Sequence, residues 1–170
     1  KDALYCDSKN SERRKSSIIV LNVILESLIK WFAPILSFTT EEIFTLINKD
    51  KKSIHLEKFM EFPKSFENVK LNEKWIQLKK IRDICNISIE TKRANKEIGS
   101  SLEASLTISL NENLFKLIDN VDFAELCITS SVKIEKNNLK EVKATTEKAE
   151  GNKCPVCWKI NKEKCKRHPN

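Results

Sequence analysis

The clearest pattern along the chain is an apolar stripe with helical spacing over residues 11–33. Apolar side chains recur there every three or four positions, while polar side chains take the opposite side, as in an amphipathic helix. The stripe consists of Leu21, Ile24, Leu25, Leu28 and Phe32. Ile29 and Trp31 widen the apolar face, so we expect a helix buried within a bundle. Pro34 ends this helix, because proline cannot continue it.

Two further helices are predicted before residue 99. Thr39 and Glu42 have the spacing of a capping box, which predicts a short helix over about residues 41–47. Residues 48–71 have no clear period and are interpreted as a crossing loop. A second long helix is predicted over about 73–97, with Asn72 as its N-cap and Gly99 as its left-handed C-terminal cap. Its apolar seam consists of Trp75, Leu78, Ile81, Cys85 and Ile89.

After Gly99 the apolar period changes from helical spacing to two, which is typical of strands. Residues 102–110 alternate clearly, residues 128–134 form a second such run, and residues 142–146 form a weak third. A short helix is predicted over 113–118. The fold class is therefore mainly α, with a helical part over 1–98, a small α/β junction over 99–146 and a C-terminal module over 147–170.

Composition excludes two kinds of nucleotide site and places the positive charge late in the chain. Gly99 and Gly151 are the two glycines, too few for a dinucleotide-binding fingerprint and too far apart for a P-loop. The net charge is +7, of which residues 133–170 supply +6 with 11 basic and 5 acidic residues. Such a basic segment is typical of a module that meets polyanions, although a solvated lysine-rich tail remains the alternative.

The longest apolar stretch does not predict a membrane span. Polar residues and Pro34 interrupt residues 18–36, whereas a span needs about 20 nearly uninterrupted apolar residues. No signal peptide is recognised, and the chain opens on Lys1 within helical sequence, so we expect a cytoplasmic piece of a longer protein without membrane partners.

The C-terminal cysteines have the spacing of a metal site. Two pairs of potential ligands each enclose two intervening residues, which allows a tight turn to aim both side chains at one ion. The four residues are Cys154, Cys157, Cys165 and His168. They predict tetrahedral Zn²⁺, in a structural role because all four positions are filled. A reduced, disordered tail is the alternative.

No catalytic constellation is recognised elsewhere. The remaining cysteines, Cys6, Cys85 and Cys127, are interpreted as packing residues, and His55 as a surface or packing residue. The carboxylates are dispersed beside lysines, which favours solvated ion pairs over acid–base chemistry.

Several segments, in order, resemble the C-terminal region of the bacterial isoleucyl-tRNA synthetase family, class I aminoacyl-tRNA synthetases. The resemblance lies in residues 1–7 (KDALYCD), 11–40, 53–56 (SIHL), 96–104 (KEIGSSLEA) and 154–158 (CPVCW). It implies that residues 1–98 are later helices of an anticodon-binding bundle and that residues 147–170 are a zinc knuckle. His168 stands where the family more often has cysteine, a substitution that zinc tolerates.

The resemblance also implies the partners: tRNA(Ile) and the catalytic and editing domains of a synthetase, with no DNA. The catalytic signatures of class I enzymes are missing from this chain, so we expect ATP to be used by the parent enzyme and not bound here. Arg93, Lys96, Trp158 and Arg167 are the candidate tRNA contacts. The alternatives are that Trp158 shields the metal and that Arg93 and Lys96 are ordinary charges at a helix end.

Two other functions are compatible with the residues. One is a free-standing zinc module that binds tRNA or a protein in trans. The other is a helical interaction domain whose knuckle is only structural.

Overall fold

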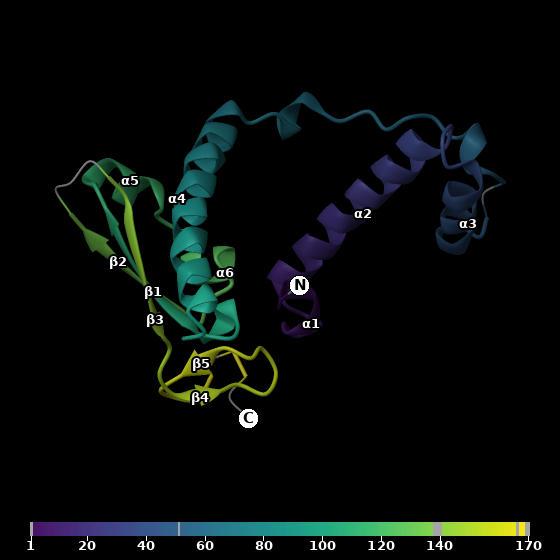
Figure 1. Cartoon of the computed structure of the whole chain (residues 1–170). Helices are drawn as coiled ribbons and strands as arrows, with labels where there is room; N and C mark the ends of the chain where they lie inside the picture. Colours follow the sequence, from purple (N-terminus) through teal and green to yellow (C-terminus); the bar gives the residue numbers. More distant parts are fainter. Residues whose placement is uncertain (1, 51, 138–140, 166, 169–170) are drawn as a thin grey trace. The chain divides into compact units, whose positions relative to one another are not determined.

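The structure is a computed structural model that describes residues 2–50, 52–137, 141–165 and 167–168 (Figure 1). The chain separates into two compact units, Lys1–Glu67 (unit 1) and Asn68–Asn170 (unit 2). This division differs from the expected boundary near Gly99, because the second long helix shares its core with the sheet that follows it.

Unit 1 is helical, and its long helix begins where the sequence predicts. The Oγ atom of Ser11 accepts a hydrogen bond from the Arg14 backbone N–H at 3.1 Å, which caps the first turn. The elements are α1 (Asp2–Tyr5), α2 (Glu12–Phe32), α3 (Ser37–Ile47) and the 3₁₀ turns η1 (Ile54–Leu56) and η2 (Lys64–Phe66).

The start of α3 corrects the predicted capping box. The helix begins at Ser37 and its N-cap, Leu36, has no capping side chain, so Thr39 lies inside the helix. The Oγ1 atom of Thr40 instead donates to the Leu36 carbonyl at 2.9 Å. The prediction failed because the next helix already starts at Ser37, the third residue after Pro34. Thr39 therefore comes too late in the chain to cap it.

The core of unit 1 is small, and it leaves most of the apolar face of α2 uncovered. Its buried side chains are Ile29, Ala33, Phe44 and Ile54. The five residues of the predicted stripe are 37–47% exposed, contrary to the expected burial. Within unit 1, α3 and η1 reach only the last turns of α2.

Unit 2 begins with α4 (Val69–Ala94), whose ends differ from those predicted. Asn68, not Asn72, is the N-cap, and its Oδ1 atom accepts from the Leu71 N–H at 2.9 Å. At the other end Lys96, not Gly99, is left-handed, with φ 58°. The Lys96 and Glu97 N–H groups donate to the carbonyls of Arg93 and Lys92, which is a Schellman motif.

The main sheet of unit 2 confirms the predicted strands. Its order is β2-β1-β3; β1 pairs with β2 in parallel and with β3 in antiparallel orientation. Leu106 lies opposite Val132 on one side and Thr146 on the other. The strands are β1 (Ala104–Leu110), β2 (Ser131–Lys136) and β3 (Lys143–Lys148). The connection from β1 to β2 contains α5 (Glu112–Leu117) and the unpredicted α6 (Phe123–Leu126).

One face of this sheet packs against α4 and forms the larger core. The alternating residues of β1, namely Ala104, Leu106, Ile108 and Leu110, are fully buried there with Leu78, Ile81, Cys85 and Ile89 of α4. Beyond the sheet, β4 (Asn152–Lys153) and β5 (Ile160–Asn161) form a short antiparallel hairpin. None of the described helices is long and apolar enough to cross a membrane.

The two asparagines near the start of α4 allow a matched test of its cap. Asn68→Ala removes the hydrogen bond to Leu71 and should lower the free energy of unfolding by about 1 kcal/mol. Asn72→Ala replaces an exposed residue inside the helix and should leave stability unchanged or slightly raised. Urea denaturation followed by circular dichroism measures both, and equal losses would contradict this cap assignment.

Candidate functional site

The short hairpin at the end of unit 2 brings the four predicted metal ligands together. Cys154 and Cys157 lie in the turn between β4 and β5, and Cys165 and His168 follow β5. The two turn cysteines are buried, and the other two residues are half-buried. The four ligand atoms lie within 4.8 Å of one another, so one metal ion can reach all of them.

Three of the six separations between these atoms are 3.6–3.7 Å. The Nδ1 atom of His168 lies 3.6 Å from the Sγ atoms of both Cys154 and Cys165. The Sγ atoms of Cys157 and Cys165 are 3.7 Å apart. The four residues predicted from their spacing therefore lie together as a cluster that could hold a metal ion.

Backbone hydrogen bonds hold the turn that carries the first two ligands. The Cys154 N–H donates to the Lys159 carbonyl at 2.9 Å, and the Trp158 N–H donates to the Cys154 carbonyl at 3.0 Å. Trp158 adopts a left-handed conformation, with φ 63°, which closes the turn tightly. Gly151, with φ 124°, precedes β4 and lies against the backbone of Asn161.

The pKa values of the two cysteine thiols in this turn are shifted in opposite directions. Hydrogen bonds from the backbone N–H groups of Cys157 and Val156 lower the pKa of the Cys154 thiol to about 6. Burial raises the pKa of the Cys157 thiol to about 12, and the neighbouring sulfur atoms of Cys154 and Cys165 add to the rise. A metal ion therefore meets one thiolate and one protonated thiol at neutral pH.

Ser130 fastens this hairpin to the sheet. Its Oγ atom accepts from the Ile160 N–H at 2.6 Å and donates to the Leu102 carbonyl. The Ser130 N–H donates to the Ala104 carbonyl at 3.0 Å, so this residue joins β5 to the start of β1. The sequence contains no signal for this role, because a serine before a strand is an ordinary feature.

Two of the predicted RNA contacts, Arg93 and Lys96, lie together beside the C-terminal end of α4. They line a hollow of about 470 Å³ with Glu90, Ile98 and Gly99. The Arg93 Nη1 atom donates to Glu90 Oε1 at 2.7 Å. Lys96 is exposed, and its left-handed backbone is a strained conformation for a side chain other than glycine.

This hollow and the hairpin meet through Glu103. The Gly99 N–H donates to Glu103 Oε2 at 3.0 Å, and the Ala149 N–H donates to the Glu103 carbonyl at 2.7 Å. Figure 1 shows the end of α4 and the β4–β5 hairpin at the same end of unit 2. The candidate metal centre and the Arg93–Lys96 hollow therefore occupy one end of this unit.

The remaining predicted contacts lie on the hairpin itself. The Trp158 side chain is 53% exposed, so much of its surface faces away from the cysteines. The Lys153 Nζ atom lies 5.4 Å from the Trp158 ring centroid, an association the sequence did not suggest. Arg167 is half-buried beside His168 in the chain.

The interpretation of the other cysteines as packing residues holds for two of them. Cys85 and Cys127 are buried in the core of unit 2, and their contact raises the pKa of the Cys85 thiol. Cys6 is half-buried in unit 1, and His55 is exposed in η1.

Comparisons with known proteins agree with the resemblance in the sequence. A family described as "Anticodon-binding domain of tRNA ligase" matches residues 1–108. The isoleucine–tRNA ligase of Pelagibacter ubique is 74% identical over 99% of this chain. Those of Agrobacterium fabrum and Bartonella henselae are 37% and 35% identical over 94% and 96% of the chain. The chain spans 19%, 18% and 18% of the lengths of these curated relatives.

The two glycines provide a matched test of the hairpin. A Cβ atom at Gly151 would lie 2.2 Å from the Asn161 carbonyl oxygen, on a backbone that disfavours side chains. Gly151→Ala should therefore disrupt the hairpin and weaken metal binding at least tenfold. At Gly99 the added atom would meet Glu103 at 3.6 Å, an ordinary contact, so Gly99→Ala should bind metal normally. Titration against a chromophoric chelator distinguishes them; equal affinities would contradict the hairpin geometry.

Metal affinity should depend on pH in two stages. Between pH 6 and 8 the Cys157 thiol keeps its proton, because its pKa is about 12, so binding must displace at least that proton. Affinity should therefore fall at least tenfold for each unit by which the pH is lowered. Below pH 6 the Cys154 thiolate also protonates, because its pKa is about 6, and the decline should steepen. Competition titrations from pH 5 to 8 measure the slope, and a flat profile would contradict these acidities.

Proposed function

Because the chain belongs to the family of anticodon-binding domains of tRNA ligases, we propose that it binds the anticodon stem and loop of tRNA(Ile) as part of an isoleucine–tRNA ligase. The observation that carries this proposal is 74% identity to such a ligase over nearly the whole chain. The ATP-dependent charging of tRNA and the editing step would belong to parts of the ligase outside this sequence, in the cytoplasm.

We propose that the ion held by the four-residue cluster is zinc. Zinc–sulfur bonds of about 2.3 Å and zinc–nitrogen bonds of about 2.0–2.1 Å give a tetrahedron with edges of roughly 3.6–3.8 Å. Three separations in the cluster, of 3.6, 3.6 and 3.7 Å, fit these edges. Four protein ligands leave no open position for water, which supports a structural role that holds Trp158 and Arg167 in place.

Electrostatics favours unit 2 as the part that meets RNA. Unit 2 has 20 basic and 14 acidic residues, a net charge of +6, whereas unit 1 has a net charge of +1. Arg93 and Lys96 would supply phosphate contacts, and the exposed ring of Trp158 would stack on an unpaired base. Anticodon loops offer both groups close together, which suits a surface where these residues share one end of the unit.

The left-handed lysine provides a test in which stability and binding should change in opposite directions. Lys96→Gly removes the backbone strain and should raise the free energy of unfolding by about 0.5–1 kcal/mol. The same change should weaken binding to a tRNA(Ile) anticodon stem-loop. Log affinity should also fall less steeply with log salt concentration. The magnitude of the slope should decrease by about 0.7–0.9, the effect of one lost phosphate contact.

Lys70→Ala is the matched control, because Lys70 is an exposed lysine in the first turn of α4, at the opposite end from Lys96. It should leave affinity and salt dependence unchanged. Fluorescence anisotropy at several salt concentrations measures the binding of each variant. Failure of the zinc-loaded chain to bind the stem-loop would refute the proposed function, whereas equal losses for both lysines would refute only the assignment of Lys96.

A further inference from the structure

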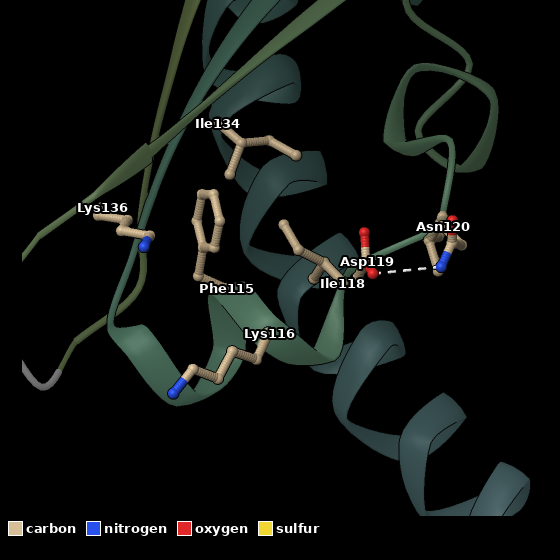
Figure 2. A pocket seen from close by; sticks show the side chains of 8 residues that line it. Phe115, Lys116, Ile118, Asp119, Asn120, Ile134 and Lys136 are labelled. Atoms are coloured by element: carbon tan, nitrogen blue, oxygen red, sulfur yellow. Dashed lines mark hydrogen bonds between the residues drawn. The ribbon is translucent and has the colours of Figure 1, made fainter.

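A second pocket lies at the other end of the main sheet, where no predicted site residue is found. It is formed by the end of α5, the turn at Asn120 and the end of β2, and its volume is about 500 Å³. This is within the roughly 300–1,000 Å³ typical of small-ligand sites. Figure 2 shows Phe115 and Ile118 facing the hollow from α5 and the residue after it, with Ile134 of β2 opposite them.

The walls of this pocket are apolar and its rim is polar. Val121 completes the apolar wall, and the Phe115 ring is half-buried there. On one side of the rim the Lys136 Nζ atom lies 4.7 Å from the Phe115 ring centroid. On the other side Asn120, in a left-handed conformation with φ 63°, presents its amide at the edge.

The polar groups of the rim provide both hydrogen-bonding and ionic contacts. The Asn120 Nδ2 atom donates to Asp119 Oδ2 at 3.2 Å, which holds the amide beside the carboxylate (Figure 2). The ion pair of Lys116 with Glu112 is highly exposed, so it opens at little cost. Lys136 has no ion pair with any residue that the structure describes.

We propose that this pocket binds one unstacked base of single-stranded RNA, with Lys136 beside the adjoining phosphate. A nucleobase has apolar faces and polar edges, which matches apolar walls with an amide and a carboxylate at the rim. The net charge of +6 on unit 2 favours a polyanion over an apolar peptide. The inference rests on the proposed function, because it takes RNA as the partner and adds a second contact point.

The pocket and the β4–β5 hairpin lie too far apart to contact the same nucleotide. The hairpin is fastened beside Ala104, where β1 begins, whereas the Asn137 N–H beside the pocket donates to Leu110, where β1 ends. A strand of seven residues is about 20 Å long, so an RNA strand that reaches both sites must extend along the sheet.

The test uses the full zinc-loaded chain and octaadenylate RNA as the probe, because pocket methyl groups can be followed individually by NMR. Octaadenylate should shift the methyl resonances of Ile118, Val121 and Ile134. Phe115→Leu, which keeps an apolar side chain, should weaken binding about tenfold by removing the stacking surface. Lys136→Gln should weaken binding, whereas Lys133→Gln should not, because Lys133 lies three positions earlier on β2 and faces the opposite side.

A self-complementary RNA duplex made of G·C pairs separates base insertion from general charge attraction. Its bases are paired, so it should leave the pocket methyl resonances unshifted. Equal shifts with single strand and duplex, or binding of single strand without any pocket shift, would overturn the inference while leaving the proposed function intact. If the pocket methyl resonances shifted only when other domains of a tRNA ligase were added, the pocket would be a protein contact and the inference would be wrong. Absence of all RNA binding, including that of the stem-loop, would refute the proposed function and this inference together.

Discussion

Four side chains of α4 meet four side chains of β1 across one face of the sheet, and unit 2 is arranged around that contact. Burying each Leu or Ile there stabilises the fold by about 1.5–3 kcal/mol. Because β1 is the central strand, β2 and β3 take their positions from it. The two ends of β1 then determine where the hairpin and the Phe115 pocket lie.

The β4–β5 hairpin is not stabilised by apolar burial in the way that this core is. Its strands have two residues each, and Cys154 and Cys157 are its buried residues among those described. An isolated hairpin of this size is marginal in water. Under the proposal that the four-residue cluster holds zinc, metal ligation would supply the missing stability, and the Ser130 hydrogen bonds link the hairpin to the sheet. The exposed Trp158 would then gain a fixed orientation.

Much of this organisation could be predicted from local patterns. The period-two runs located all three strands of the main sheet, and the spacing of the cysteines located the four residues that could hold a metal ion. The helix ends were less accurate because Asn68 and Asn72 both precede apolar turns, and only the folded chain shows which amide caps. Lys96 was missed as the left-handed residue because a nearby glycine offered the better intrinsic preference. The anchor at Ser130 and the pocket at Phe115 depend on contacts between segments far apart in the chain, which local spacing does not encode.

The parallel pairing of β1 with β2 has a consequence for how the chain is made. The edge of β1 that pairs with β2 stays unpaired until Lys136, 136 − 110 = 26 residues later, has left the ribosome, and the other edge until Lys148, 148 − 110 = 38 residues later. At about 5–20 residues per second the longer interval lasts about 2–8 seconds. During it, α4 already covers the apolar face, and the other face presents the hydroxyl groups of Ser105, Thr107 and Ser109. The exposed edges of a nascent β1 therefore belong to a strand with one polar side, which lowers its tendency to aggregate during synthesis.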